Sequence, residues 1–170
     1  MDESHIRDAQ MIHATWQEKG KQQQVKVEGK LTTLSLFGCA NTLTGEFFCM
    51  KTKRCNAQTF EQFLSYLLEQ NPEKHLVIVL DNARYHHARR LKPFLKRNED
   101  RLTFCFLPPY SPNLNLIERI WGWLKDTVVA NTFYKTQEHL VKKIEQFLEK
   151  MAQSPEMVLS RLGQPHMLIT

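Results

Sequence analysis

Two acidic residues follow stretches of sequence that restrict where the backbone can go. Asp81 comes directly after the apolar run LVIVL, and Glu118 follows the proline-rich stretch LPPYSPN at residues 107–113. In open α/β sheets, chemistry collects at the carboxyl ends of strands, which is the position of Asp81. A rigid approach to Glu118 suits a ligand of Mg²⁺, since that ion needs oxygen atoms at about 2.0–2.1 Å in near-ideal geometry. Both are therefore candidate metal ligands, and Asp2 is a third.

Each of these acids also has a purely structural explanation. Asp81 could cap the N-terminus of a following helix, and Glu118 could complement the dipole of the helix it begins. Asp2 could belong to a frayed acidic terminus, where Glu3 and Asp8 are competing acids. The residues alone leave these alternatives open.

The hydrophobic pattern predicts the elements that would position the acids. The predicted elements are strands within 25–37, a hairpin turn near Asn41–Gly45 followed by a strand at 46–50, a helix at 58–70, a strand at 76–80, a helix from His86 to Asn98, a strand at 102–107, a helix at 115–129 and a helix at 136–152. The unbroken apolar run at 76–80 predicts a strand buried on both faces. Pro93 is expected to limit or bend its helix. The order predicts a mixed α/β sheet covered by helices.

Length, charge and cysteine content narrow the class of protein. The 170 residues suit one domain, and a net charge of +5 permits a polyanionic partner, although a solubilising surface explains that charge equally well. There is no apolar run of membrane-spanning length and no signal peptide, so a cytoplasmic location without membrane contact is expected. The four cysteines form no Cys-x-x-Cys pair, which argues against structural zinc and predicts reduced thiols.

Two long motifs carry a family resemblance. LVIVLDNARYHHA, followed by LPPYSPNLNLIERIWGWLK, resembles the catalytic domain of mariner-like and related bacterial insertion-sequence transposases. These proteins belong to the DDE superfamily and have an RNase H-like fold. The motifs lie in the family's order, with Asp81 and Glu118 separated by 37 positions (118 − 81). The similarity extends along nearly the whole chain and includes Asp2-Glu3 and Thr44-Gly45.

The resemblance implies an activity and a site. Asp2, Asp81 and Glu118 would be the catalytic triad and would hold two Mg²⁺ or Mn²⁺ ions for phosphodiester hydrolysis and strand transfer. The substrate would be DNA, and the protein would act as a homodimer on paired element ends. Within a bacterial cytoplasm it would associate with the nucleoid when bound to DNA.

The resemblance also places the first acid at the end of a central first strand, yet only Met1 precedes Asp2. We therefore expect residues 1–170 to form a single catalytic domain with an RNase H-like mixed sheet that lacks most of its first strand and the N-terminal helix-turn-helix region. The chain could be the second reading frame of a split element, joined to the product of an upstream frame, or a truncated copy. An incomplete central strand predicts low activity and marginal stability for the isolated chain.

Two rival functions stay open. The chain could be a non-catalytic truncated fragment that binds DNA or full-length transposase and regulates it, and the position of Asp2 relative to Asp81 and Glu118 would discriminate. It could also be a different RNase H-like nuclease, although the motif YSPNLNLIE argues against this.

Polar and aromatic residues near Asp81 and Glu118 could support the site or the core. Asn82 could orient Asp81. His86 and His87 lack the further ligands that a zinc site needs, so a packing or surface role is expected for them. Tyr85 is expected to pack in the core, and Trp123 lies off the apolar stripe, where it could touch DNA or a partner.

Overall fold

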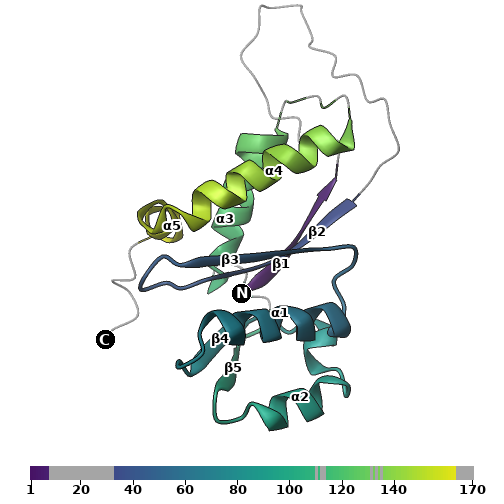
Figure 1. Cartoon of the computed structure of the whole chain (residues 1–170), viewed down its shortest axis with the longest axis vertical. Helices are drawn as coiled ribbons and strands as arrows, with labels where there is room; N and C mark the ends of the chain where they lie inside the picture. The colour runs from purple at the N-terminus through teal and green to yellow at the C-terminus, as the bar shows by residue number, and fades with distance from the viewer. Residues whose placement is uncertain are drawn as a thin grey trace, which may run out of the picture.

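A computed structural model of the chain describes residues 1–7, 33–109, 111, 114–130, 132, 134 and 136–163 (Figure 1). In chain order the elements are β1 (Asp2–Arg7), β2 (Thr33–Ala40), β3 (Phe47–Thr52), α1 (Ala57–Gln70), β4 (Leu76–Leu80), the 3₁₀ turn η1 (Arg84–His87), α2 (Leu91–Arg97), β5 (Leu102–Phe106), α3 (Ile117–Leu124), the π-helical turn η3 (Lys125–Val129), α4 (Gln137–Ala152) and α5 (Pro155–Leu162). The α/β class is as predicted.

The strands form two sheets. β1, β2 and β3 make an antiparallel sheet in which Asp2 lies opposite Gly38, while β4 and β5 pair in parallel. The predicted hairpin is confirmed, because β2 and β3 pair directly and Gly45 adopts a φ of 78° in the turn. At the boundary between the sheets, the Met1 ammonium group donates a hydrogen bond of 2.8 Å to the Val79 carbonyl. Thus β1 and β4 approach each other at the N-terminus.

Helices cover both faces of the three-stranded sheet (Figure 1). Successive residues of β2 point to opposite faces, so Leu36 joins one apolar core and Phe37 joins the other. The Leu36 core is built mainly by α3, α4 and α5, and the Phe37 core by α1, α2, β4 and β5. This three-layer arrangement explains why the predicted apolar stripes of the helices are buried.

Local capping signals agree with the helix positions. Asn56 caps α1, where its side chain accepts from the amides of Gln58 and Thr59. Thr136 caps α4 by accepting from the His139 amide at 3.3 Å, which confirms the predicted start of that helix. In the part of the chain that the structure describes, no helix is both long enough and apolar enough to cross a membrane.

The predicted helix from His86 to Asn98 is wrong in its continuity. The chain forms η1, becomes extended at Ala88, and restarts as α2 at Leu91. Pro93 lies in the first turn of α2, where a missing amide costs no intrahelical hydrogen bond, so it helps to begin the helix rather than bend it. Leu91 and Phe94 are the buried residues of α2.

Three further predictions need correction or fall outside the described residues. β4 is not buried on both faces, because Val77 and Val79 are 63% and 42% exposed. Asp2 does not lie in a frayed terminus, since it begins the six-residue strand β1. Of the strands predicted at 25–37, residues 25–32 lie outside the described part, as does Asp8. Helix α5 was not predicted.

Candidate active site

Asp81 is held rigidly at the end of β4. Its Oδ1 accepts a hydrogen bond of 3.0 Å from the Ala83 amide, and His86 Nδ1 lies 3.2 Å from the same oxygen. His86 Nδ1 also lies 3.1 Å from the Asp81 carbonyl oxygen. The His86 side chain is 1% exposed, whereas that of Asp81 is 47% exposed. A buried imidazole therefore supports a carboxylate that remains open to solvent.

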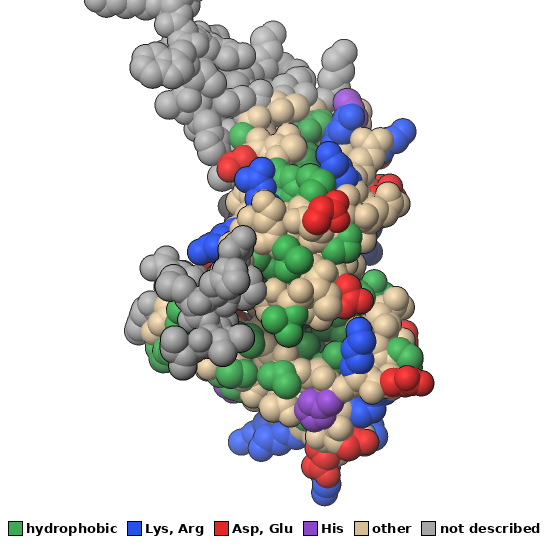
Figure 2. All heavy atoms as spheres, turned by 90° about the vertical axis from the view of Figure 1, so that its left-hand side faces the viewer, with side chains coloured by type: hydrophobic (Ala, Val, Ile, Leu, Met, Phe, Trp, Pro, Cys, Tyr) green, Lys and Arg blue, Asp and Glu red, His purple; other side chains and the backbone are tan. Residues whose placement is uncertain are grey.

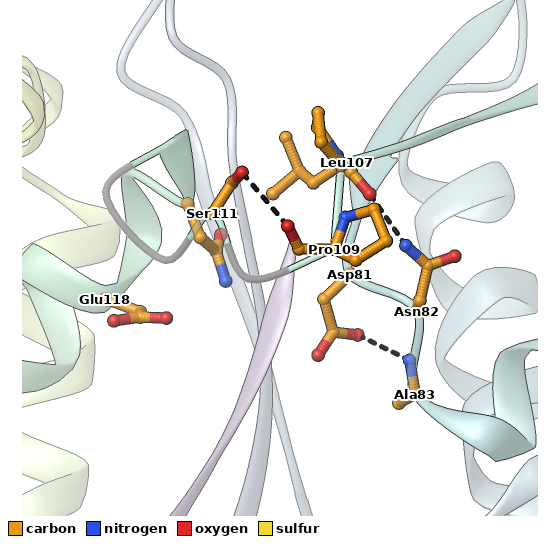
Figure 3. Close-up of a pocket in the computed structure, with 9 residues that line it drawn as sticks. Asp81, Asn82, Ala83, Leu107, Pro109, Ser111 and Glu118 are labelled. Carbon is orange, nitrogen blue, oxygen red and sulfur yellow. Dashed lines mark hydrogen bonds between the residues drawn. The ribbon is translucent and has the colours of Figure 1, made fainter.

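Asn82 does not orient Asp81 as predicted. Its side-chain amide instead donates a hydrogen bond of 2.7 Å to the Leu107 carbonyl (Figure 3). This bond ties the end of β4 to the end of β5. Asn82 therefore anchors the chain at Leu107, while Ala83 and His86 hold Asp81.

Glu118 projects from the first turn of α3 and is exposed. The opposite side of this helix is buried through Ile117, Ile120, Trp121 and Leu124. Before the helix, the Glu118 amide donates to the Asn115 carbonyl at 3.1 Å. The buried stripe fixes the rotation of α3, and that rotation determines where the Glu118 carboxylate points.

Asp81 and Glu118 line one cavity of about 410 Å³, although they come from different elements. In Figure 3, Glu118 extends from α3 towards the side on which Asp81 presents the carboxylate oxygen not bound to Ala83. The other lining residues are Asn82, Ala83, Leu107, Pro108, Pro109, Ser111 and Asn115. A cavity with two carboxylates, two side-chain amides and one hydroxyl offers hard oxygen donors, which suit Mg²⁺ or Mn²⁺.

Asp2 lies near this cavity without lining it. Burial raises the pKa of Asp2 to about 7, the neighbouring charge of Glu3 adds to this, and Asp81 also contributes. Asp2 therefore experiences the field of Asp81 across the boundary between the two sheets. Among the described residues, however, no three His, Cys, Asp or Glu side chains are grouped closely enough to hold a metal ion.

Glu3, the competing acid, lies among the groups that surround Asp81. Burial raises the pKa of Tyr85, and Glu3 and Asp81 raise it further, while the charge of Glu3 also acts on His86. Tyr85 packs against Phe37 and Phe60, with ring centroids 6.2 and 5.8 Å apart, as the predicted core role requires. Asp2 stays the candidate of the two acids because the charge of Asp81 acts on it directly.

Sequence reasoning did not predict the site roles of His86 and Asn115. The packing role predicted for His86 is confirmed, since its side chain is buried and its ring centroid lies 4.5 Å from that of Phe60, but its place five residues after Asp81 also brings it under the carboxylate. Asn115 is a buried polar residue in the cavity wall. Trp123, considered for DNA contact, packs on Phe147 with centroids 4.8 Å apart, and the Arg161 guanidinium lies 4.5 Å from its ring.

Comparison with known proteins gives a consistent set of relatives. Residues 1–141 match the sequence model of the family described as DDE superfamily endonuclease. The chain is 29% identical over 155 residues to the "Insertion element IS630 uncharacterized 39 kDa protein" of Shigella sonnei, covering 91% of this chain and 45% of that protein. It is 25% identical over 126 residues to "Uncharacterized protein y4pE/y4sA" of Sinorhizobium fredii, covering 74% of this chain and 90% of that protein.

Several of the solved structures that match this fold are of the Mos1 mariner transposase. The Mos1 mariner paired end complex with Mn aligns with a TM-score of 0.65 at 16% identity, over 95% of this chain and 52% of that one. The catalytic domain of Mos1 mariner transposase aligns with a TM-score of 0.50 at 17% identity, over 77% of this chain and 71% of that one. These matches confirm the RNase H-like fold. The chain spans about half the length of the Shigella relative and of the Mos1 chain in that complex.

Proposed function

The chain belongs to the DDE superfamily endonucleases, and from this we propose that it is a single catalytic domain of a DNA transposase. In this proposal Asp2, Asp81 and Glu118 are the catalytic residues. The reaction is metal-dependent cleavage of DNA phosphodiesters, followed by strand transfer of the element ends. The relatives named after an insertion element and after a mariner transposase support this assignment.

One observation carries the proposal. Asp81 and Glu118 are separated by 37 positions in the sequence, yet they line the same cavity. Asp2, from a third segment, is close enough to Asp81 for their charges to interact. A shared cavity is the minimum requirement for carboxylates that cooperate on one phosphodiester.

The chemistry of the donors that line the cavity suits Mg²⁺ or Mn²⁺, and we propose that the site holds two such ions. The donors in the cavity are carboxylate, amide and hydroxyl oxygens. Burial and the neighbouring carboxylates raise the pKa of Asp2, so a bound cation would be electrostatically favourable beside it. When bound, such ions activate the attacking water or 3′-hydroxyl and stabilise the leaving oxygen. Asp81 and Glu118 would hold them, with Asp2 completing the set.

The chain's own groups prepare the site for that chemistry. Ala83 and His86 hold one oxygen of Asp81, so the other stays directed into the cavity. The buried stripe of α3 holds Glu118 opposite it. Arg84 is exposed and directly follows the cavity residue Ala83 in the sequence, and we propose that it contacts a DNA phosphate. We further propose a homodimer on paired DNA ends and a cytoplasmic location.

A regulatory role is the second candidate. Asp2 does not line the cavity, and the described residues contain no complete three-ligand cluster. A fragment that binds DNA or a full-length transposase without cutting would show this arrangement. The two functions differ in one measurable respect, which is metal-dependent cleavage.

The deciding experiment measures nicking of supercoiled plasmid in the presence of Mg²⁺ or Mn²⁺. It compares the 170-residue chain with a longer form in which the product of an upstream reading frame is fused to Met1. We expect cleavage by the full-length form, and Asp81→Asn, Glu118→Gln or Asp2→Asn should each reduce it by at least about 10²-fold. Glu145→Gln, at an exposed ion pair with Lys51, is the control and should cut normally. Normal cutting by a triad variant would remove that residue from the site.

A further inference from the structure

Glu3 is a partly buried acid to which the proposed reaction gives no role. Asp and Glu side chains lie at the surface on the face of the molecule drawn in Figure 2, as their charge favours. One carboxylate oxygen of Glu3, Oε2, is instead buried, and it has no hydrogen-bond partner within the described part of the chain. Burying such an atom without a partner is unfavourable, so the groups around Glu3 decide what it contributes.

Two residues of η1 lie beside Glu3. The Tyr85 hydroxyl oxygen and His86 Nε2 are also buried and also lack a hydrogen-bond partner among the described residues, and the centroids of the two rings are 4.4 Å apart. Burial raises the pKa of Tyr85, and a contact between its hydroxyl and the Glu3 carboxylate raises it further. Burial lowers the pKa of His86, whereas contacts with Asp81 and the charge of Glu3 oppose that change. Glu3 therefore belongs with the turn that supports Asp81.

The register of β1 with β2 explains how Glu3 reaches η1. Glu3 pairs with Phe37, and the side chains of paired residues lie on the same face of an antiparallel sheet. Phe37 faces the core that α1, β4 and β5 help to build, and its ring centroid lies 6.2 Å from that of Tyr85. Alternation along the strand places Asp2 on the other face. Glu3 therefore approaches the turn after β4 from the side of the sheet opposite to that of Asp2.

Hydrogen-bonding capacity fixes the direction of each contact. An ionised carboxylate only accepts, so the Tyr85 hydroxyl must donate to Glu3. A phenol that donates to a carboxylate makes a charge-assisted bond, which is stronger than a bond between neutral groups. At the other end of the cluster, His86 Nδ1 lies 3.2 Å from Asp81 Oδ1 and 3.1 Å from the Asp81 carbonyl oxygen. Both oxygens accept, so this ring nitrogen carries the hydrogen.

We propose that Glu3 is a positioning residue of the active site, which anchors the Tyr85 hydroxyl and so fixes η1. Through His86, the fixed turn then holds the Asp81 carboxylate in one orientation. Because Glu3 belongs to β1 and η1 follows β4, the contact also joins the two sheets, and with them Asp2 and Asp81. The inference rests on the proposed function, since a fixed carboxylate matters where a divalent ion is held in near-ideal geometry.

The first test needs neither metal nor DNA. It follows the His86 Nδ1–H signal of the metal-free 170-residue chain by NMR and measures how fast that hydrogen exchanges with water. We expect exchange to be at least about tenfold faster in Glu3→Leu and in Tyr85→Phe, because the turn loses its anchor. Glu3→Gln keeps an oxygen that accepts from Tyr85, so its exchange should stay within about threefold of wild type. Tyr66→Phe removes a hydroxyl elsewhere in the same core and is the matched control, which should leave exchange unchanged.

The second test asks whether Glu3 acts through Tyr85, and it measures Mn²⁺ binding by titration. Glu3→Leu and Tyr85→Phe should each raise the Kd for Mn²⁺ about tenfold. The double variant should also raise it only about tenfold, because both changes remove the same contact. If Glu3 were itself a metal ligand, Glu3→Gln would weaken binding as much as Glu3→Leu, and Tyr85→Phe would leave binding unchanged. That pattern would overturn the proposal, and so would a double variant whose effect is the product of the two single effects.

The exchange measurement decides the proposal even if the proposed function fails. Exchange of the His86 hydrogen that is as fast in wild type as in Glu3→Leu and Tyr85→Phe would overturn it. Faster exchange in the variants supports it even if no form of the chain binds Mn²⁺ or cleaves DNA, so the two failures can be told apart. If Glu3→Leu does not fold, Tyr85→Phe compared with Tyr66→Phe gives the answer, because both keep the aromatic ring.

Discussion

Gly38 packs closely against the indole ring of Trp121. A Cβ atom placed on Gly38 would lie 2.4 Å from Trp121 Cζ2 and 3.2 Å from Ile117 Cδ1. Gly38 is also the residue opposite Asp2 in the sheet, and Trp121 belongs to the helix that carries Glu118. The absence of a side chain at Gly38 therefore lets α3 approach the strand that bears the first acid.

Gly38→Ala should displace α3, because the new methyl group cannot fit against the ring. We expect the free energy of unfolding, measured by urea denaturation, to fall by about 1–3 kcal/mol. Cleavage by the full-length form should fall by more than the loss of folded protein explains. Gly122→Ala is the matched control, since a Cβ there meets nothing within 4 Å. Alanine inside a helix should leave stability unchanged or raise it by up to about 1 kcal/mol. If both variants behaved alike, close packing at Gly38 would not position Glu118.

His86→Leu should release Asp81 from its buried support while keeping an apolar side chain in the core. Loss of the contacts with the Asp81 carboxylate and carbonyl should weaken Mn²⁺ binding and cleavage about 10–100-fold, measured by titration and plasmid nicking. His87→Leu controls for the neighbouring imidazole, which is exposed and stacks on Phe106 with centroids 4.5 Å apart. An unchanged Mn²⁺ affinity in His86→Leu would contradict a positioning role.

Asp2 should make the metal-free protein less stable as pH rises. Its pKa is about 7 in the folded chain against an ordinary value of 3.8, so the folded state binds the proton more tightly. The free energy of unfolding, measured in EDTA, should therefore fall between about pH 4 and pH 7 and become level above that range. Asp2→Asn should remove this component, whereas Glu73→Gln on the exposed loop before β4 should retain it. A pH profile identical in wild type and Asp2→Asn would refute the burial of Asp2.

The four cysteines are free thiols, as predicted, and they should differ in reactivity. Burial raises the pKa of Cys49 to about 12 and that of Cys55 to about 11, and it also raises the pKa of Cys39. Cys105 is exposed on β5. Iodoacetamide at pH 8 should therefore modify Cys105 first, as followed by mass spectrometry, because the thiolate is the reactive form. Faster labelling of Cys49 would show that the folded chain opens readily.

Local pattern was sufficient for most elements and for the two acids that line the cavity. The 3.6-residue stripes of α1 and α4 were correctly identified because burial of one helix face leaves a periodic trace, and the apolar run at 76–80 correctly predicted the strand β4 although not its burial. The two motifs around Asp81 and Glu118 pointed to the residues that line the cavity. The break between η1 and α2 was missed, because Pro93 suits the first turn of a helix as well as a bend within one.

The sequence by itself determined the α/β class, the family resemblance and the acidic candidates, since residue type, spacing and hydrophobic period are properties of the linear chain. The tertiary structure alone decided that Asp81 and Glu118 share a cavity and that His86 supports Asp81. It also decided that Asp2 begins a strand facing α3 while β4 keeps an exposed edge. Those facts depend on how sheets and helices from distant segments pack together, and no local period encodes a contact between residues that are far apart in the chain.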